Sequence, residues 1–157
     1  MHQHDRGTKM GEYETDLVLW SEHQSTLLRR IATGEAVNEA PDWDNIIEEI
    51  EQLGRSDRRE LRSQIQRVLE HLIKLRASPA TDPRSGWSRS IAEAQIKMSD
   101  LLDESPSLRR EVASIITRQL PTARKLARMD LEARGDRPIV DLEGLSFTET
   151  DVLGGQS

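Results

Sequence analysis

The 157-residue sequence contains no cysteine, which excludes disulfide bonds, cysteine-based zinc sites, iron–sulfur clusters and cysteine nucleophiles. Aromatic residues make up only 3% of the chain, too few for a platform on which single-stranded nucleic acid could stack. No apolar run approaches the roughly 20 residues that cross a bilayer, and the polar N-terminus lacks the apolar core of a signal peptide. We therefore expect a cytoplasmic protein with no membrane association.

The apolar residues that are present recur every three or four positions over most of the chain, and no stretch alternates with a period of two. This spacing predicts an all-α protein. We expect a mobile tail at 1–11, a helical bundle domain at 12–135 and an extended C-terminal segment at 136–157, with a short helix near 148–153. Four amphipathic helices joined by short connections pack best as an antiparallel four-helix bundle.

The boundaries of these helices follow from glycine and proline positions. The first helix should span 16–33 and end at Gly34 in a left-handed cap. The second should open after Pro41 and run to about Ala77, a long helix of roughly 35 residues and about 50 Å at 1.5 Å per residue. A break at Gly54 is the alternative. The third helix should begin near Ser85, and the fourth at Ser105-Pro106, with the serine as its cap.

The second helix carries two apolar patches separated by a polar, arginine-rich segment. Both patches have helical spacing and are expected to stabilise the bundle by burial. The first contains Trp43, Ile46, Ile47, Ile50 and Leu53, and the second contains Leu61, Ile65, Val68, Leu69, Leu72 and Ile73.

Several short motifs resemble a bacterial family known as domain of unknown function 29, over roughly residues 13–130. The most specific is the run Glu48-Glu49-Ile50-Glu51-Gln52-Leu53-Gly54-Arg55-Ser56. The others are Tyr13-Glu14-Thr15-Asp16, Leu69-Glu70-His71-Leu72-Ile73-Lys74 and Ser105-Pro106-Ser107-Leu108. The resemblance implies an all-helical fold and brings no assigned activity. The sequence departs from the family in its C-terminal third, where Leu145-Ser146-Phe147-Thr148 replaces a segment that ends in tryptophan.

Charge is distributed unevenly along the chain, whose formal net charge is −6. Residues 1–54 carry 4 basic and 12 acidic side chains, whereas residues 55–135 carry 17 basic and 11 acidic ones. An arginine segment with i, i+3, i+4 and i+7 spacing forms a basic face on the second helix and contains Arg55, Arg58, Arg59 and Arg62, with Ser56 among them. Arginine suits phosphate and carboxylate, but the overall acidic balance disfavours nucleic acid as the partner. Pairing with acidic residues of the chain is the other interpretation.

Candidate residues for chemistry are few. Glu48 and Glu51 share a helix face with i, i+3 spacing, and His71 and Lys74 follow on the same helix. The Glu-x-x-His pairs of carboxylate-bridged metal sites are missing, so we predict no metal site and no cofactor. Glu48 and His71 are 23 positions apart, about 35 Å along a straight helix. We expect His71 to be a partly buried side chain that is hydrogen-bonded to a neighbour.

The start of the third helix offers a weaker candidate at Arg84 and Ser85. Free amide groups at a helix start can hold an anion, whereas the simpler interpretation is that Ser85 caps the helix.

Three functions fit these observations. The sequence favours a non-enzymatic protein-interaction module that binds an unknown protein partner or a second copy of itself. Its docking site would be the arginine segment between the two apolar patches, with a second contact at Trp43 if that ring is exposed. The alternatives are an enzyme or metal-binding bundle built on Glu48, Glu51, His71 and Lys74, and a phosphate or nucleic-acid binder that uses the arginine segment.

Overall fold

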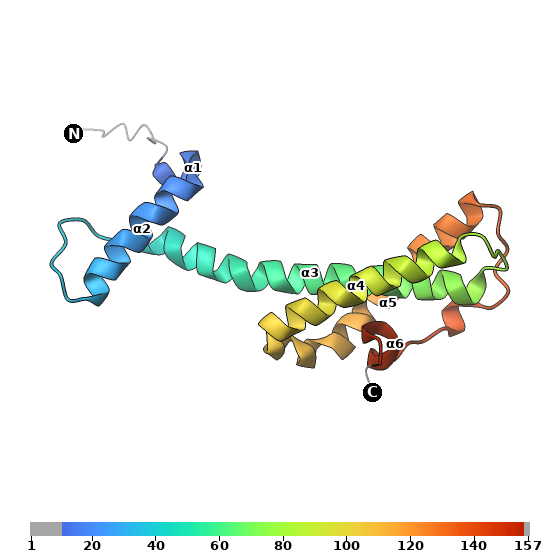
Figure 1. The fold of residues 1–157 in the computed structure, drawn as a ribbon. Coiled ribbons are helices and arrows are strands. Elements are labelled where there is room, and N and C mark those ends of the chain that lie inside the picture. The colour runs from blue at the N-terminus through green and yellow to red at the C-terminus, as the bar shows by residue number, and fades with distance from the viewer. Residues whose placement is uncertain (1–10, 156–157) are drawn as a thin grey trace, which may run out of the picture. The chain divides into compact units, whose positions relative to one another are not determined.

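The computed structural model describes residues 11–155. Within that range every regular element is a helix, so the predicted all-α class is confirmed. The tail predicted at 1–11 lies, except for Gly11, outside the described residues. The helices are α1 (Glu12–Thr15), α2 (Leu17–Ala32), α3 (Trp43–Ala77), α4 (Arg84–Glu104), η1 (Pro106–Glu111), α5 (Val112–Ala133), η2 (Leu142–Gly144) and α6 (Glu149–Leu153), where η marks a 3-10 helix (Figure 1).

The predicted helix boundaries agree closely with these elements. Helix α3 has 35 residues and continues through Gly54, because a glycine in a helix interior costs only about 1 kcal/mol relative to alanine. Gly34 follows α2 with a φ of +80°, the left-handed conformation expected of a C-terminal cap. The C-terminal segment contains the predicted short helix as α6, whose N-terminus is capped by Thr148 and Asp151.

The chain divides into two compact units, an N-terminal unit at 1–54 and a C-terminal unit at 55–157. Helix α2 therefore belongs to a different unit from α4 and α5. The antiparallel four-helix bundle that we expected is not confirmed, and the two units are described in turn.

The N-terminal unit has a small interior formed by α1, α2 and the start of α3. Trp20, Leu27 and Pro41 are its buried apolar residues among those described, and Gln24 is buried as well. The ring of Tyr13 packs edge-on against Trp20, with ring centroids 4.9 Å apart. The Trp20 indole N–H donates to Asp42 at 2.9 Å, and the side-chain oxygen of Gln24 accepts from the Asp42 backbone N–H at 2.8 Å. These bonds attach α2 to the residue that precedes α3.

The C-terminal unit has a larger core, in which 22 apolar residues of the described range 55–155 are buried. Contacts at both ends of the helices define their directions. Asp57 near the start of this part of α3 accepts from Ser105, which follows α4, and Lys74 near its end lies over the Trp87 ring at the start of α4. Helix α4 is therefore antiparallel to α3 and runs beside it (Figure 1). Lys74 also reaches Asp130 near the end of α5, so α5 runs parallel to α3.

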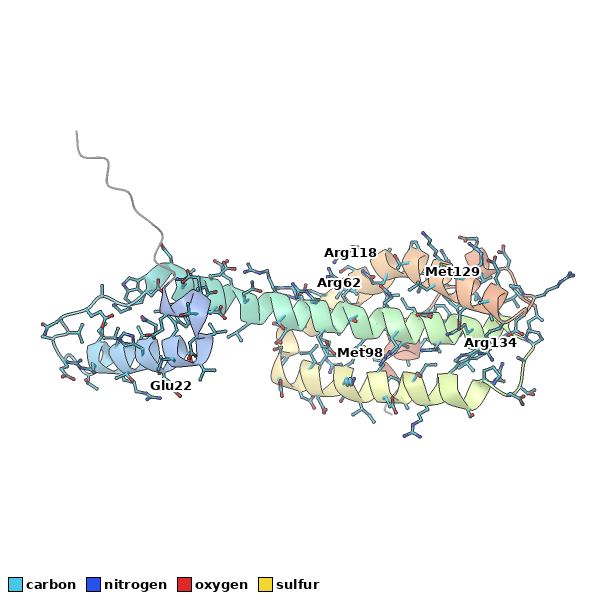
Figure 2. All side chains as sticks on the ribbon, turned by 90° about the horizontal axis from the view of Figure 1, so that it is seen from above. Glu22, Arg62, Met98, Arg118, Met129 and Arg134 are labelled. Carbon is cyan, nitrogen blue, oxygen red and sulfur yellow. The ribbon has the colours of Figure 1, made fainter. Side chains whose placement is uncertain are left out.

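Individual side chains of this core match the helix stripes predicted for 85–104. Trp87, Ile91, Ala94, Met98 and Leu101 are all buried. Met98 is fully buried, whereas Met129 of α5 is 56% exposed (Figure 2). The prediction that Ser105 caps the next helix is wrong: its hydroxyl donates to Asp57 instead, and a 3-10 helix with Pro106 near its start precedes α5.

Candidate functional site

One side of α3 in the N-terminal unit is an exposed apolar surface, which we name the α3 apolar face. It consists of Trp43, Ile47, Ile50 and Leu53, which are 51%, 52%, 63% and 69% exposed. Spacings of four, three and three residues place these side chains on one side of the helix. Large apolar residues are here gathered on one exposed face, whereas single scattered ones are normal on protein surfaces.

The second apolar patch of the same helix has the opposite environment. Leu61, Ile65, Val68 and Leu69 have no exposed surface and pack in the core of the C-terminal unit. The expectation that both patches stabilise one bundle by burial is thus wrong for the first patch. Of its members only Ile46 is partly buried, because α1 and α2 cover too little of α3.

Hydrogen bonds on another side of α3 hold this part of the helix in place. Asp42 accepts from the Asn45 side chain at 2.8 Å and from the Trp20 indole, and these bonds lower the pKa of the Asp42 carboxyl. The Tyr13 hydroxyl donates to Glu49 at 2.6 Å, a bond that raises the pKa of Tyr13 to about 12. Asp42, Asn45 and Glu49 therefore face α1 and α2, and the α3 apolar face is left uncovered by them.

Acidic side chains border the α3 apolar face. Asp44, Glu48 and Glu51 follow one another at helical spacing on the flank next to Ile47, and Asp44 and Glu51 are exposed. Over residues 11–54 the chain carries 11 acidic and 2 basic side chains, the basic ones being Arg29 and Arg30. Arg30 is paired with Glu35 at 3.0 Å. Residues 11–54 therefore carry a net negative charge.

The arginine segment predicted as a docking site belongs to the C-terminal unit. Arg55, Ser56, Arg58, Arg59 and Arg62 are all exposed. Arg58 forms an ion pair with Glu111 at 3.1 Å, across the contact between α3 and η1. Arg124 and Arg128 of α5 likewise bind Glu143 and neighbouring carbonyl groups. The interpretation of basic residues as internal pairing partners is thus confirmed for these three arginines.

Lys74 and His71 lie in the C-terminal unit, one helical turn apart. Lys74 is almost fully buried, and its Nζ donates to Asp130 Oδ2 at 2.7 Å and lies 3.5 Å from Glu70. The bond from Lys74 lowers the pKa of Asp130. This lysine is a structural cation whose charge is already compensated.

The structure corrects one expectation for His71. The side chain is partly buried as predicted, but its Nδ1 atom is buried with no hydrogen-bond partner among the described residues. Burial, followed by the charges of Lys74 and Arg67, lowers the pKa of His71 to about 4. At neutral pH the ring is therefore uncharged.

The four residues considered as a metal or catalytic site belong to two different units. Glu48 and Glu51 belong to the N-terminal unit, and His71 and Lys74 to the C-terminal unit. In the described part of the chain, no three side chains of histidine, aspartate or glutamate come close enough to hold a metal ion. Lys74 is occupied by Asp130, and His71 lacks a hydrogen-bonded partner that could relay a proton.

The start of α4 differs from the prediction. Helix α4 begins at Arg84, and Pro83 occupies the cap position with no side-chain cap, so Ser85 lies inside the first turn and does not cap the helix. The Arg84 guanidinium donates to the Leu75 carbonyl at 2.8 Å. It ties the loop after α3 to the end of that helix, which is a structural role.

Sequence reasoning missed several polar residues of the C-terminal unit. Asp130 and Arg124 act through partners distant in the sequence, so no local spacing pattern identifies them. A polar hollow of about 530 Å³ also went unpredicted; its lining comprises Glu60, Ser63, Gln64, Gln66, Arg67, Glu70 and His71 of α3, with Lys97 of α4. It is open to solvent, and its walls are hydrophilic.

The sequence matches one known protein family. The family described as Domain of unknown function DUF29 matches residues 12–138. The chain belongs to the DUF29 family. This confirms the resemblance read from the sequence, and the matched DUF29 region contains the α3 apolar face and the whole of α2 to α5. No curated protein and no solved structure matches the chain.

Membership of DUF29 supplies no activity, because the family is defined without one. Over residues 11–155, no helix of this DUF29 protein is at once long and apolar enough to cross a membrane.

Proposed function

We propose that this DUF29 protein is a non-enzymatic interaction module that docks a protein partner through the α3 apolar face. One observation carries the proposal: four large apolar side chains of one helix face are each more than half exposed, while the continuation of that helix buries the same residue types completely. Fully burying a side chain such as isoleucine or leucine contributes about 1.5–3 kcal/mol. A partner that covers the face would bury the exposed part of several side chains at once and gain the corresponding part of this energy.

The internal geometry of the N-terminal unit supports a binding role over a purely structural one. The start of α3 is fixed without a partner by hydrogen bonds that Trp20 and Tyr13 donate and one that Gln24 accepts. A preorganised helix face loses little conformational entropy on binding, which favours affinity. The partner is another protein or a second copy of this chain.

The test compares two isoleucines of equal exposure. Ile50 lies in the α3 apolar face and Ile96 on α4 of the C-terminal unit, and each is 63% exposed. Tagged wild-type protein, Ile50→Asp and Ile96→Asp are used for affinity capture from cell lysate, and their oligomeric state is measured by light scattering. We expect a stoichiometric partner, or self-association, that is lost in Ile50→Asp and retained in Ile96→Asp.

Association that survives Ile50→Asp would contradict the proposal.

The same assay tests the arginine segment. Arg55→Glu combined with Arg58→Glu abolishes binding if that segment contacts the partner. Circular dichroism of each variant distinguishes lost binding from lost folding, which matters for Arg58 because of its ion pair with Glu111.

A further inference from the structure

The chemistry of the partner can be inferred from the surroundings of the α3 apolar face. The face extends from Trp43 to Leu53, about 15 Å at the 1.5 Å rise of a helix. Its side chains stand in a single row on a convex helix. Such a row packs most closely into the groove of a second helix, because side-chain ridges of one helix fill the grooves of the other.

The charges around the face indicate which charge the second helix carries. Asp44, Glu48 and Glu51 border the row, and residues 11–54 carry 11 acidic against 2 basic side chains. A second N-terminal unit placed against this face would bring the same negative charge into close approach, which is unfavourable. An anionic bilayer is disfavoured for the same reason, since helices that bind membrane surfaces carry lysine and arginine beside their apolar side.

We infer that the α3 apolar face binds a basic amphipathic helix of another protein. Leucine or isoleucine side chains of that helix contact Ile47 and Ile50, and its lysine or arginine side chains face Asp44. This inference rests on the proposed function and adds the charge and the secondary structure of the partner to it. Helix-in-groove recognition of this kind uses a few apolar anchors for affinity and flanking charges for specificity.

The experiment uses two synthetic peptides of about 18 residues, long enough to cover the face as a helix. Both have leucine on one helical side; one carries lysine and the other glutamate at all remaining positions. Binding of each fluorescently labelled peptide to the full-length protein is measured by anisotropy at low and at high salt. We expect the leucine–lysine peptide to bind roughly tenfold or more tightly than the leucine–glutamate peptide, and more weakly at high salt.

Three variants test whether the peptide binds at the α3 apolar face. Ile50→Asp should abolish binding of the leucine–lysine peptide, and Ile96→Asp should leave it unchanged, because the two side chains are equally exposed before substitution. Asp44→Asn should weaken binding of the lysine peptide and leave any binding of the glutamate peptide unaffected. Binding of the lysine peptide that persists in Ile50→Asp reflects general charge attraction and overturns the inference.

The remaining outcomes separate this inference from the proposed function. Equal binding of both peptides, or self-association of the wild type that Ile50→Asp disrupts, overturns the basic helix and leaves docking through the face intact. Failure of both peptides, together with no lysate partner or self-association sensitive to Ile50→Asp, overturns the inference and the proposed function together.

Discussion

At the scale of single residues, the polar side chains of the C-terminal unit are mostly structural. Lys74 is the clearest case. It is almost fully buried, its charge is compensated by Asp130 and Glu70, and its Nζ lies 5.4 Å from the centre of the Trp87 ring. A buried charge held in this way stabilises one arrangement of α3, α4 and α5, because any other arrangement would leave the ammonium group without partners.

His71 makes stability depend on pH. Its pKa in the folded protein is lowered to about 4 by burial and by the neighbouring cations Lys74 and Arg67, while the unfolded chain has the ordinary value near 6.5. Between pH 4 and 6.5 the unfolded state therefore binds more protons than the folded state. The contribution of His71 to stability is complete above pH 6.5 and is lost as the pH falls toward 4. We expect His71→Gln to remove this component. Urea unfolding of both proteins at several pH values measures it.

His23 of the N-terminal unit serves as a control, because its pKa is shifted in the opposite direction. Its hydrogen bond to Glu39 raises the pKa of His23 above the ordinary value. Stability from His23 is therefore present below pH 6.5 and is lost as the pH rises through the raised pKa. In an NMR titration the His71 ring should protonate well below pH 6.5 and the His23 ring above it. A His71 ring that titrates near 6.5 would contradict the prediction.

At the scale of elements, Arg124 of α5 attaches the C-terminal segment to the core. Its guanidinium donates to the carbonyls of Leu142, Glu143 and Leu145 at 3.1, 3.2 and 2.7 Å, and its side chain is 18% exposed. Lysine cannot reproduce this set, because its donors share one nitrogen. We predict that Arg124→Lys destabilises the segment by about 1–3 kcal/mol, seen as faster hydrogen exchange over 139–153.

Arg128→Lys is the matched control for that prediction. Arg128 lies one turn further along α5, is 44% exposed and binds the Glu143 side chain at 3.1 Å. An exposed ion pair of this kind contributes little to stability. Equal effects of the two substitutions on hydrogen exchange would show that the carbonyl contacts of Arg124 do not hold the segment.

The elements were largely predictable from the sequence, and their burial was not. Helix boundaries follow from local features such as Gly34, Pro41 and the spacing of apolar residues, so α2 and α3 agree with prediction within a residue or two. Ile50 and Ile65 have the same local pattern, yet one is 63% exposed and the other fully buried. The difference depends on which helices pack against each part of α3, and local spacing contains no such information.

The same reasoning explains the partial prediction of the candidate site. Trp43 was identified as a contact on the condition that its ring is exposed, and it is 51% exposed. The arginine segment was expected as a docking site between two buried apolar patches; its arginines are exposed, but the first patch is exposed as well and only the second is buried. Asp130, 56 residues from Lys74, could not be assigned to it from one sequence.

At the scale of the whole molecule, the two units differ greatly in the apolar surface that they bury. Among the residues that the structure describes, 22 buried apolar side chains form the core of the C-terminal unit, whereas Trp20, Leu27 and Pro41 are buried in the N-terminal unit. Burial of apolar surface is the dominant stabilising contribution to folding. Segments with few buried contacts open at lower free energy than the global transition.

We therefore predict that residues 55–157 fold without the rest of the chain and that residues 11–54 do not. The fragment 55–157 should show a helical circular dichroism spectrum and a cooperative thermal transition close to that of the full-length core, whereas 11–54 should show little helix. In the full-length protein, amides of α2 should exchange faster than those of α4 and α5. Identical protection of α2 and α5, or loss of cooperative unfolding in 55–157, would contradict the prediction.

A low-stability N-terminal unit would also be the part that a bound partner stabilises most. A partner that binds the folded form and not the unfolded form raises the stability of the folded form.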